Sequence, residues 1–196
     1  MPRIRISPWL PVGLCILYRL DSVGCFWPFL LAAAVHELGH ITVLYLTGAR
    51  VRALALSLGG AVLETSSLSY HQELLSAAAG PIFGLLLLTV RRSFPWLAFW
   101  GVIQSLYNLL PIYPLDGGRI LQALLASKLP LHRAEGICRG VSIGLGIIMC
   151  GCSLYAVRIL GILPVLIASF LFLQILGTVH GEFINFSCKK RSQKLQ

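Results

Sequence analysis

The sequence predicts an all-α polytopic membrane protein with about six transmembrane helices and a short membrane-associated β-hairpin. Three observations support this fold class. Of 196 residues, 57% are hydrophobic and only 12% are charged, whereas soluble domains average about 25% charged residues. The mean hydropathy is +0.81, and apolar segments fill nearly all of the chain between residues 8 and 180. One interval between these segments, residues 51–65, instead has the pattern of two short strands around a Gly-Gly turn.

The apolar segments divide into six expected spans, at residues 8–20, 24–47, 72–90, 96–110, 139–157 and 161–179. A membrane-spanning helix needs about 20 residues, so the first segment is short; it borrows flanking residues, tilts or enters only partway. The expected strands are residues 51–58 and 61–65. Lipid offers no hydrogen-bond partners for the unpaired backbone N–H and C=O groups of such a hairpin. We therefore expect it at the surface or lining the protein's own cavity, as a plain connector or as an edge that pairs with an extended peptide.

We expect residues 1–196 to form a single membrane domain, with a core at 24–119, additional helices at 139–179 and a basic tail at 181–196. A polar connector at about 119–138 joins the core to the additional helices. The tail would lie on anionic lipid headgroups. Despite a net charge of +9, the cations lack the interleaved aromatic residues that bind nucleic acid, so we expect no nucleic-acid partner.

The distribution of positive charge indicates the orientation of the chain. Six spans place both termini on one side, and the positive-inside rule makes that side cytoplasmic. This side would hold 12 of the 16 lysine and arginine residues, namely Arg3, Arg5, Arg50, Arg52, Arg119, Lys128, Arg133, Arg139, Lys189, Lys190, Arg191 and Lys194.

The second expected span contains the pattern H-E-x-x-H, at His36-Glu37-Leu38-Gly39-His40. Positions i and i+4 of a helix share one face, so both imidazoles can reach one metal ion, usually Zn²⁺. Glu37 is then placed to take a proton from water at the metal. Charged residues at the centre of a span are unfavourable by about 2.5–3.5 kcal/mol, and are functional by default. Gly39 keeps this face thin, which would let a substrate backbone come close.

The fourth expected span ends in an irregular segment, Asn108 to Arg119, that contains two prolines, two adjacent glycines and one acid. Broken backbone at membrane depth is tolerated where it lines a cavity. Taken alone, Asp116 would be the N-cap of a helix that starts at Gly117. A catalytic zinc site, however, needs three protein ligands, and a carboxylate is a common third, so Asp116 is the best-placed candidate.

With these motifs the chain resembles the site-2 protease family, zinc metalloproteases that cut inside the membrane, and in particular its stage IV sporulation branch. Two motifs carry the resemblance: residues 36–40, and Asn108 through Asp116-Gly117-Gly118. Leu58-Gly59-Gly60 and Ala79-Gly80-Pro81 also fit the family pattern. These motifs span residues 36–119, and the paired H-E-x-x-H and L-D-G in apolar context are highly specific.

The resemblance implies one zinc ion per chain, with Glu37 as the catalytic base. The implied zinc ligands are His36, His40 and Asp116. The implied substrate-binding residues are Asn108, which would also act in catalysis by holding the substrate backbone or the oxyanion, Pro114 in the same loop, and Gly59 and Gly60 in the hairpin.

The resemblance further implies an intramembrane metalloendopeptidase of the bacterial cytoplasmic membrane, with its active site toward the cytoplasmic side. Its substrate would be a membrane-tethered protein, with pro-sigma and anti-sigma factors as candidates, and a membrane partner would regulate it. We expect neither the nucleotide-sensing CBS domain of the sporulation branch nor the PDZ domain of other branches. A membrane zinc transporter or metal sensor using the same ligands remains the alternative. The oligomeric state is left open.

Overall fold

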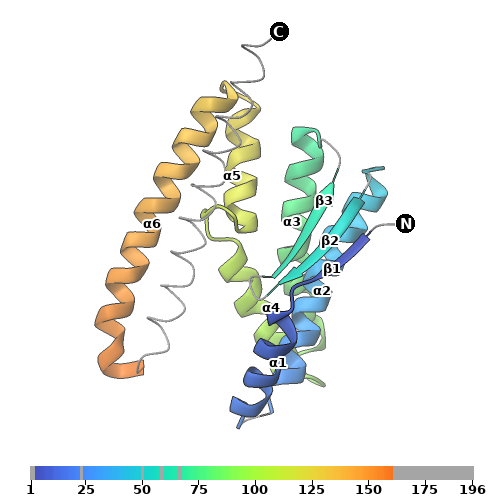
Figure 1. Cartoon of the computed structure of the whole chain (residues 1–196), viewed down its shortest axis with the longest axis vertical. Helices are drawn as coiled ribbons and strands as arrows, with labels where there is room; N and C mark the ends of the chain where they lie inside the picture. Colours follow the sequence, from blue (N-terminus) through green and yellow to red (C-terminus); the bar gives the residue numbers. More distant parts are fainter. Residues whose placement is uncertain (1–2, 23, 50, 58–59, 66–67, 161–196) are drawn as a thin grey trace. The chain divides into compact units, whose positions relative to one another are not determined.

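The computed structural model describes residues 3–22, 24–49, 51–57, 60–65 and 68–160 (Figure 1). The chain divides into two compact units, Met1–Leu109 and Leu110–Gln196. The expected span at 161–179 and the expected basic tail at 181–196 lie outside the described residues. Both segments, and the expected single domain, therefore stay predictions.

The first unit is built on three helices that pack on one another: α2 (Phe26–Leu46), α3 (Tyr70–Leu86) and α4 (Pro95–Asn108). A 3₁₀ turn, η1 (Leu87–Val90), extends α3. Polar side chains mark where two of the helices begin. The carboxylate of Asp21 accepts hydrogen bonds from the N–H groups of Cys25, which precedes α2, and of Phe26, its first residue. Ser69 and Gln72 form a capping box at the start of α3.

Small residues bring α3 and α4 into close contact. A Cβ atom at Gly101 would lie 2.6 Å from the carbonyl oxygen of Gly84, and a Cβ atom at Gly84 would collide with Ser105 Oγ. The hydroxyl of Ser105, a fully buried residue, lies 2.7 Å from the carbonyl oxygen of Gly101 and 3.0 Å from that of Pro81. Small residues and interhelical hydrogen bonds are what hold helices together in lipid, where no hydrophobic force does so.

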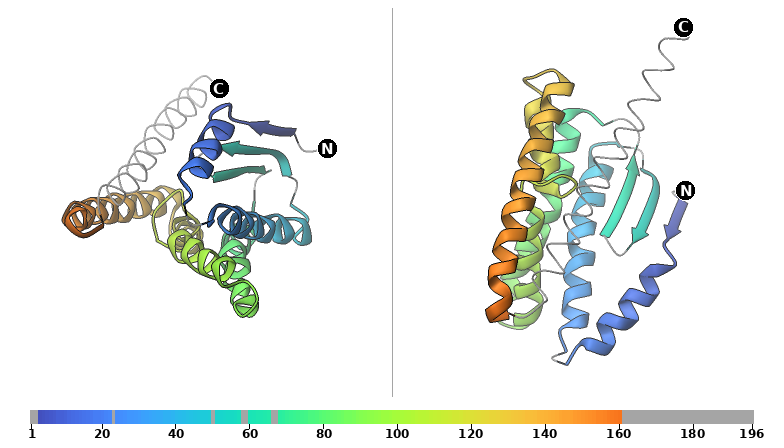
Figure 2. Two further views of the ribbon diagram at one scale, coloured as in Figure 1. Left: turned by 90° about the horizontal axis from the view of Figure 1, so that it is seen from below. Right: turned by 60° about the vertical axis from the view of Figure 1, so that its left-hand side comes forward.

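A three-stranded sheet and helix α1 (Trp9–Leu20) complete the first unit (Figure 2). The strands, in their order across the sheet, are β1 (Arg3–Ile6), β2 (Val51–Ser57) and β3 (Gly60–Thr65). β2 pairs antiparallel with β3, with Ser57 opposite Gly60, over the residues expected for the hairpin. Gly60 is therefore the first residue of β3, while Gly59 lies outside the described residues.

The strand β1 is not expected from the sequence. It pairs parallel with β2, with Ile4 opposite Leu54, and so makes β2 the central strand. Its sequence, Arg-Ile-Arg-Ile, alternates between polar and apolar residues, but only over four positions, and its partner lies some fifty residues away in the chain. In the described sheet, an added strand can pair only with β1 or β3.

The second unit contains α5 (Asp116–Ala126) and α6 (Leu131–Leu160), which pack against each other and run antiparallel (Figure 1). Most of the expected polar connector at 119–138 is helical, and the helix expected from residue 139 begins at Leu131. Charged residues such as Lys128 and Arg133 lower the hydropathy of this stretch, yet α6 begins at Leu131. A fall in hydropathy marks where a helix becomes exposed to water, and this point differs from the residue at which the helix begins.

Three helices in the described part of the chain are long and apolar enough to cross a membrane: Phe26–Leu46, Tyr70–Val90 and Leu131–Tyr155. They overlap the second, third and fifth expected spans. Helix α1 has 12 residues and α4 has 14, both below the roughly 20 that a straight crossing requires. The expected total of six spans is therefore not confirmed.

Candidate metal centre

His36 and His40 lie one turn apart on the buried face of α2, as their spacing predicts. Each residue is only 5% exposed, and their Nε2 atoms are 3.1 Å apart. Two ligands of a tetrahedral zinc ion, each about 2.0–2.1 Å from the metal, lie about 3.3 Å apart. The separation of the two nitrogens therefore fits a pair of ligands that share one ion.

Helix α3 fixes the orientation of the His40 ring. Nδ1 of His40 lies 2.7 Å from the carbonyl oxygen of Ser76, a fully buried residue. A carbonyl oxygen can only accept, so Nδ1 carries a proton, and in the neutral ring Nε2 then presents its lone pair. Metal-binding histidines are characteristically oriented in this way by a partner behind the ring. The donor set on α2 thus fits a metal ion.

Gly80 of α3 packs directly against both imidazoles. A Cβ atom at this position would collide with Nε2 of His40 and would lie 2.7 Å from Nε2 of His36. Any larger residue would therefore displace the nitrogens that could bind metal. The run of small residues around Gly80 predicts close helix packing, but the sequence alone does not show which side chains this glycine meets.

Gly39 has a different role from the expected one. A Cβ atom there would lie 2.7 Å from the carbonyl oxygen of Ala79 and 2.9 Å from Cγ of Phe83, both on α3. The expectation that Gly39 leaves room for a substrate backbone was wrong, because this space is filled by α3. Gly39 and Gly80 instead let α2 and α3 pack closely around the two histidines.

Glu37 and Asn108 also belong to the first unit. Glu37 is half-buried on α2, and Asn108 is the last residue of α4. The side-chain amide of Asn108 donates to the carbonyl oxygen of Gln104 at 3.0 Å. The side chain of Gln104 in turn donates to the carbonyl oxygen of Phe29 on α2, also at 3.0 Å. Asn108 is therefore held on a segment of α4 that is tied to the histidine-bearing helix.

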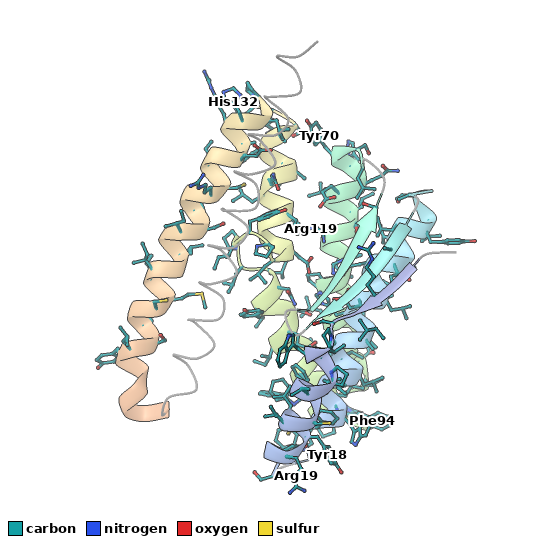
Figure 3. All side chains as sticks on the ribbon, viewed as in Figure 1. Tyr18, Arg19, Tyr70, Phe94, Arg119 and His132 are labelled. Atoms are coloured by element: carbon teal, nitrogen blue, oxygen red, sulfur yellow. The ribbon has the colours of Figure 1, made fainter. Side chains whose placement is uncertain are left out.

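Asp116 is the first residue of α5, in the second unit, and is 6% exposed. It does not act as the N-cap, because Leu115 takes that position. Its Oδ1 atom lies 3.4 Å from Nη1 of Arg119, one turn further along α5 (Figure 3 labels Arg119). A carboxylate in the first turn of a helix is favoured by the helix dipole.

The loop before Asp116 folds tightly onto α5. The N–H group of Leu115 donates to the carbonyl oxygen of Ile112 at 2.8 Å, and Ile112 is fully buried. A Cβ atom at Gly118 would lie 2.6 Å from that same oxygen. Pro114 is half-buried within this turn. The second glycine of the Asp-Gly-Gly motif thus leaves space for the loop that carries Pro114.

A polytopic helical fold with a buried histidine pair on a membrane-length helix defines the chain as a membrane protein of metal-binding type. Residues 86–149 match the sequence model of Peptidase family M50. The solved structure of the site-2 protease from Methanocaldococcus jannaschii has the same fold, with a TM-score of 0.67, 24% identity and 89% coverage of each chain. The chain thus resembles peptidase family M50 over residues 86–149 and shares the fold of a site-2 protease.

Two curated relatives extend the comparison. The zinc metalloprotease MJ0392 of Methanocaldococcus jannaschii is 28% identical over 180 residues, which cover 82% of this chain and 51% of the relative. Stage IV sporulation protein FB of Bacillus subtilis is 29% identical over 181 residues, which cover 85% of this chain and 61% of the relative. The chain thus spans only about half to three-fifths of the length of these two relatives.

Proposed function

We propose that this protein is a zinc-dependent intramembrane metalloendopeptidase that cleaves a membrane-tethered protein within or near the bilayer. The observation that carries the proposal is the buried histidine pair, with its Nε2 atoms 3.1 Å apart and Nδ1 of His40 bonded to a backbone carbonyl. The match of residues 86–149 to the Peptidase family M50 model supports the same conclusion. The likeness to a zinc metalloprotease and to a stage IV sporulation protein supports it as well.

In this proposal His36, His40 and Asp116 hold one zinc ion per chain. Two neutral imidazoles and one carboxylate leave a fourth tetrahedral position for water or substrate. Bound there, zinc would polarise the scissile carbonyl and make water nucleophilic near neutral pH. All three side chains are at least nine-tenths buried, as zinc ligands below a lipid surface should be.

Glu37 is the proposed general base and acid. It follows His36 directly on α2, so a metal held by the histidines would lie close to its carboxylate. The carboxylate takes the proton from the attacking water and returns it to the leaving amine. Because Glu37 is half-buried, it can meet both water and the scissile bond.

Asn108 is the proposed hydrogen-bond donor to the oxyanion or to the substrate backbone. A side-chain amide has two N–H groups, and the bond to Gln104 needs one of them. This bond orients the amide and leaves a second N–H group for the substrate. Pro114 is proposed to shape the loop that faces the same substrate.

The substrate must be extended at the cut, because a helical peptide has its carbonyl groups engaged. We propose that it is held by strand addition to the sheet, at the free side of β3 near Gly59 and Gly60. The support is the sheet order, in which β2 is central and β3 is an edge strand. We propose pro-sigma and anti-sigma factors as candidate substrates; the resemblance to the stage IV sporulation branch supports this choice.

The proposed setting is the bacterial cytoplasmic membrane, crossed about six times, with the active site toward the cytoplasm. The support is the positive charge of the connectors and the three membrane-length helices. A membrane partner would regulate cleavage, and the basic tail would contact anionic lipid.

The deciding experiment is cleavage of a membrane-tethered peptide by the purified protein in detergent, with and without a zinc chelator. We expect chelation to stop cleavage and added zinc to restore it. If the zinc-loaded protein leaves every tethered peptide intact but carries zinc into liposomes, the protease proposal fails and the transporter alternative replaces it.

A further inference from the structure

We propose that Ser142 of α6 is a positioning residue for the zinc site, because its hydroxyl holds the loop that leads into Asp116. The inference rests on the proposed function, in which Asp116 is a zinc ligand. Neither the sequence motifs nor the family resemblance gives Ser142 a role.

Two hydrogen bonds define the position of Ser142. Its hydroxyl accepts from the backbone N–H group of Tyr113 at 2.8 Å and donates to the carbonyl oxygen of Cys138 at 2.8 Å. Ser142 is only 2% exposed. Tyr113 is half-buried, and a backbone N–H group that is shielded from water needs an acceptor. Ser142 therefore supplies an acceptor that the loop needs.

The loop is held between two helices. On the α5 side, Ile112 is fully buried and its carbonyl oxygen faces Gly118. On the α6 side, the bond between Tyr113 and Ser142 fixes the next residue. Figures 1 and 2 both show this loop lying beside α6 at the N-terminal end of α5. In Figure 3, Arg119 is labelled near the N-terminal end of α5, and His132 is labelled near the C-terminal end of α5.

Asp116 is only three residues beyond Tyr113, so movement of the loop reaches it directly. Binding constellations must be held to within about 0.5 Å to function. Partners behind a metal ligand typically change metal affinity by about 10–100-fold when removed. The bond to Ser142 acts on the backbone and not on the carboxylate itself, so we expect an effect near the lower end of that range.

A second serine on the same helix provides a matched control. The hydroxyl of Ser153 donates to the carbonyl oxygen of Cys150 at 2.8 Å, and Ser153 is 7% exposed. Like Ser142, it donates to a carbonyl oxygen in the preceding turn of α6, and in the described part of the chain no loop N–H group donates to it. Any difference between alanine variants at the two positions therefore reports on the loop.

The test measures zinc affinity of the purified protein by competition with a chelator. We expect Ser142→Ala to weaken zinc binding about tenfold and Ser153→Ala to leave it unchanged. Ser142→Thr, which keeps the hydroxyl, should restore the affinity. Hydrogen exchange at the Tyr113 amide should also be faster in Ser142→Ala than in the unaltered protein. Unaltered zinc affinity in Ser142→Ala would overturn the proposal.

Two further points keep the test decisive. If Ser142→Ala does not fold, Ser142→Cys carries the test, because a thiol fills the space but is a weak acceptor; wild-type affinity in that variant would also overturn the proposal. Peptide cleavage is measured separately. A protein that binds zinc less tightly after Ser142→Ala, but never cleaves peptide, would refute the protease function and still support the positioning role.

Discussion

Nδ1 of His40 lies 2.7 Å from the carbonyl oxygen of Ser76, so a backbone group of α3 sets the tautomer of a side chain on α2. Whether Nε2 of His40 can bind a metal ion therefore depends on how α2 and α3 pack. Gly39 and Gly80 bring them close enough for the bond to form. The orientation of the histidine pair is therefore built into the α2–α3 interface.

Gly80→Ala should disrupt the histidine pair. The added methyl group would collide with Nε2 of His40 and crowd Nε2 of His36, so we expect zinc affinity to fall by about 10–100-fold. Isothermal titration with zinc measures the change. The matched control is Gly140→Ala in α6, where a Cβ atom would meet nothing within 4 Å. Equal zinc affinity in both variants would show that the imidazoles can move aside.

Glu37→Gln should separate metal binding from catalysis. Glutamine has the size of glutamate but cannot accept the proton of water, so we expect cleavage to fall by about 10²–10⁴-fold. Zinc content, measured by atomic absorption on the same sample, should stay at the wild-type level. Retained proteolysis would exclude Glu37 as the base.

Asp116→Asn should weaken zinc binding, because a neutral amide oxygen is a poorer ligand than a carboxylate. We expect the purified variant to hold clearly less zinc than the unaltered protein. Glu135→Gln makes the same chemical change on α6 and should leave zinc content unchanged. Undiminished zinc in the Asp116 variant would reject this residue as a ligand and leave it the role of a helix-terminal acid paired with Arg119.

Asn108→Ala should lower turnover while zinc stays bound. Removing one donor to an oxyanion typically reduces kcat by about 10²–10³-fold, with little change in metal content. Steady-state kinetics with a tethered peptide, together with zinc analysis, distinguish this outcome from unfolding. A kcat equal to that of the unaltered protein would mean that the amide serves only its bond to Gln104.

The local parts of this structure could be predicted from the sequence. The spacing of His36 and His40 places both on one helical face, and the structure confirms that their nitrogens meet. The apolar segments that form α2 and α3 could also be predicted from the sequence. Such features depend only on helix periodicity and hydropathy, which short stretches of sequence carry.

Features that depend on contacts between distant segments could not be predicted. The sequence does not show that Gly39 faces Ala79 or that Ser142 accepts from Tyr113, because nothing local indicates which helix faces which. The start of α6 was missed for a different reason. Its first turns carry charged residues and resemble a connector, although the helix simply extends beyond its apolar part.

The parallel pairing of β1 with β2 constrains the order in which the protein can assemble. Residues Arg3–Ile6 are synthesised before their partners, Ala53–Leu56, which follow only after α1 and α2 have been made. Parallel strands always require such a crossover, and contacts between distant segments form late. The sheet can thus close only once the histidine-bearing helix has been synthesised, so a nascent chain stalled before residue 53 would have both imidazoles but no strand for β1 to join.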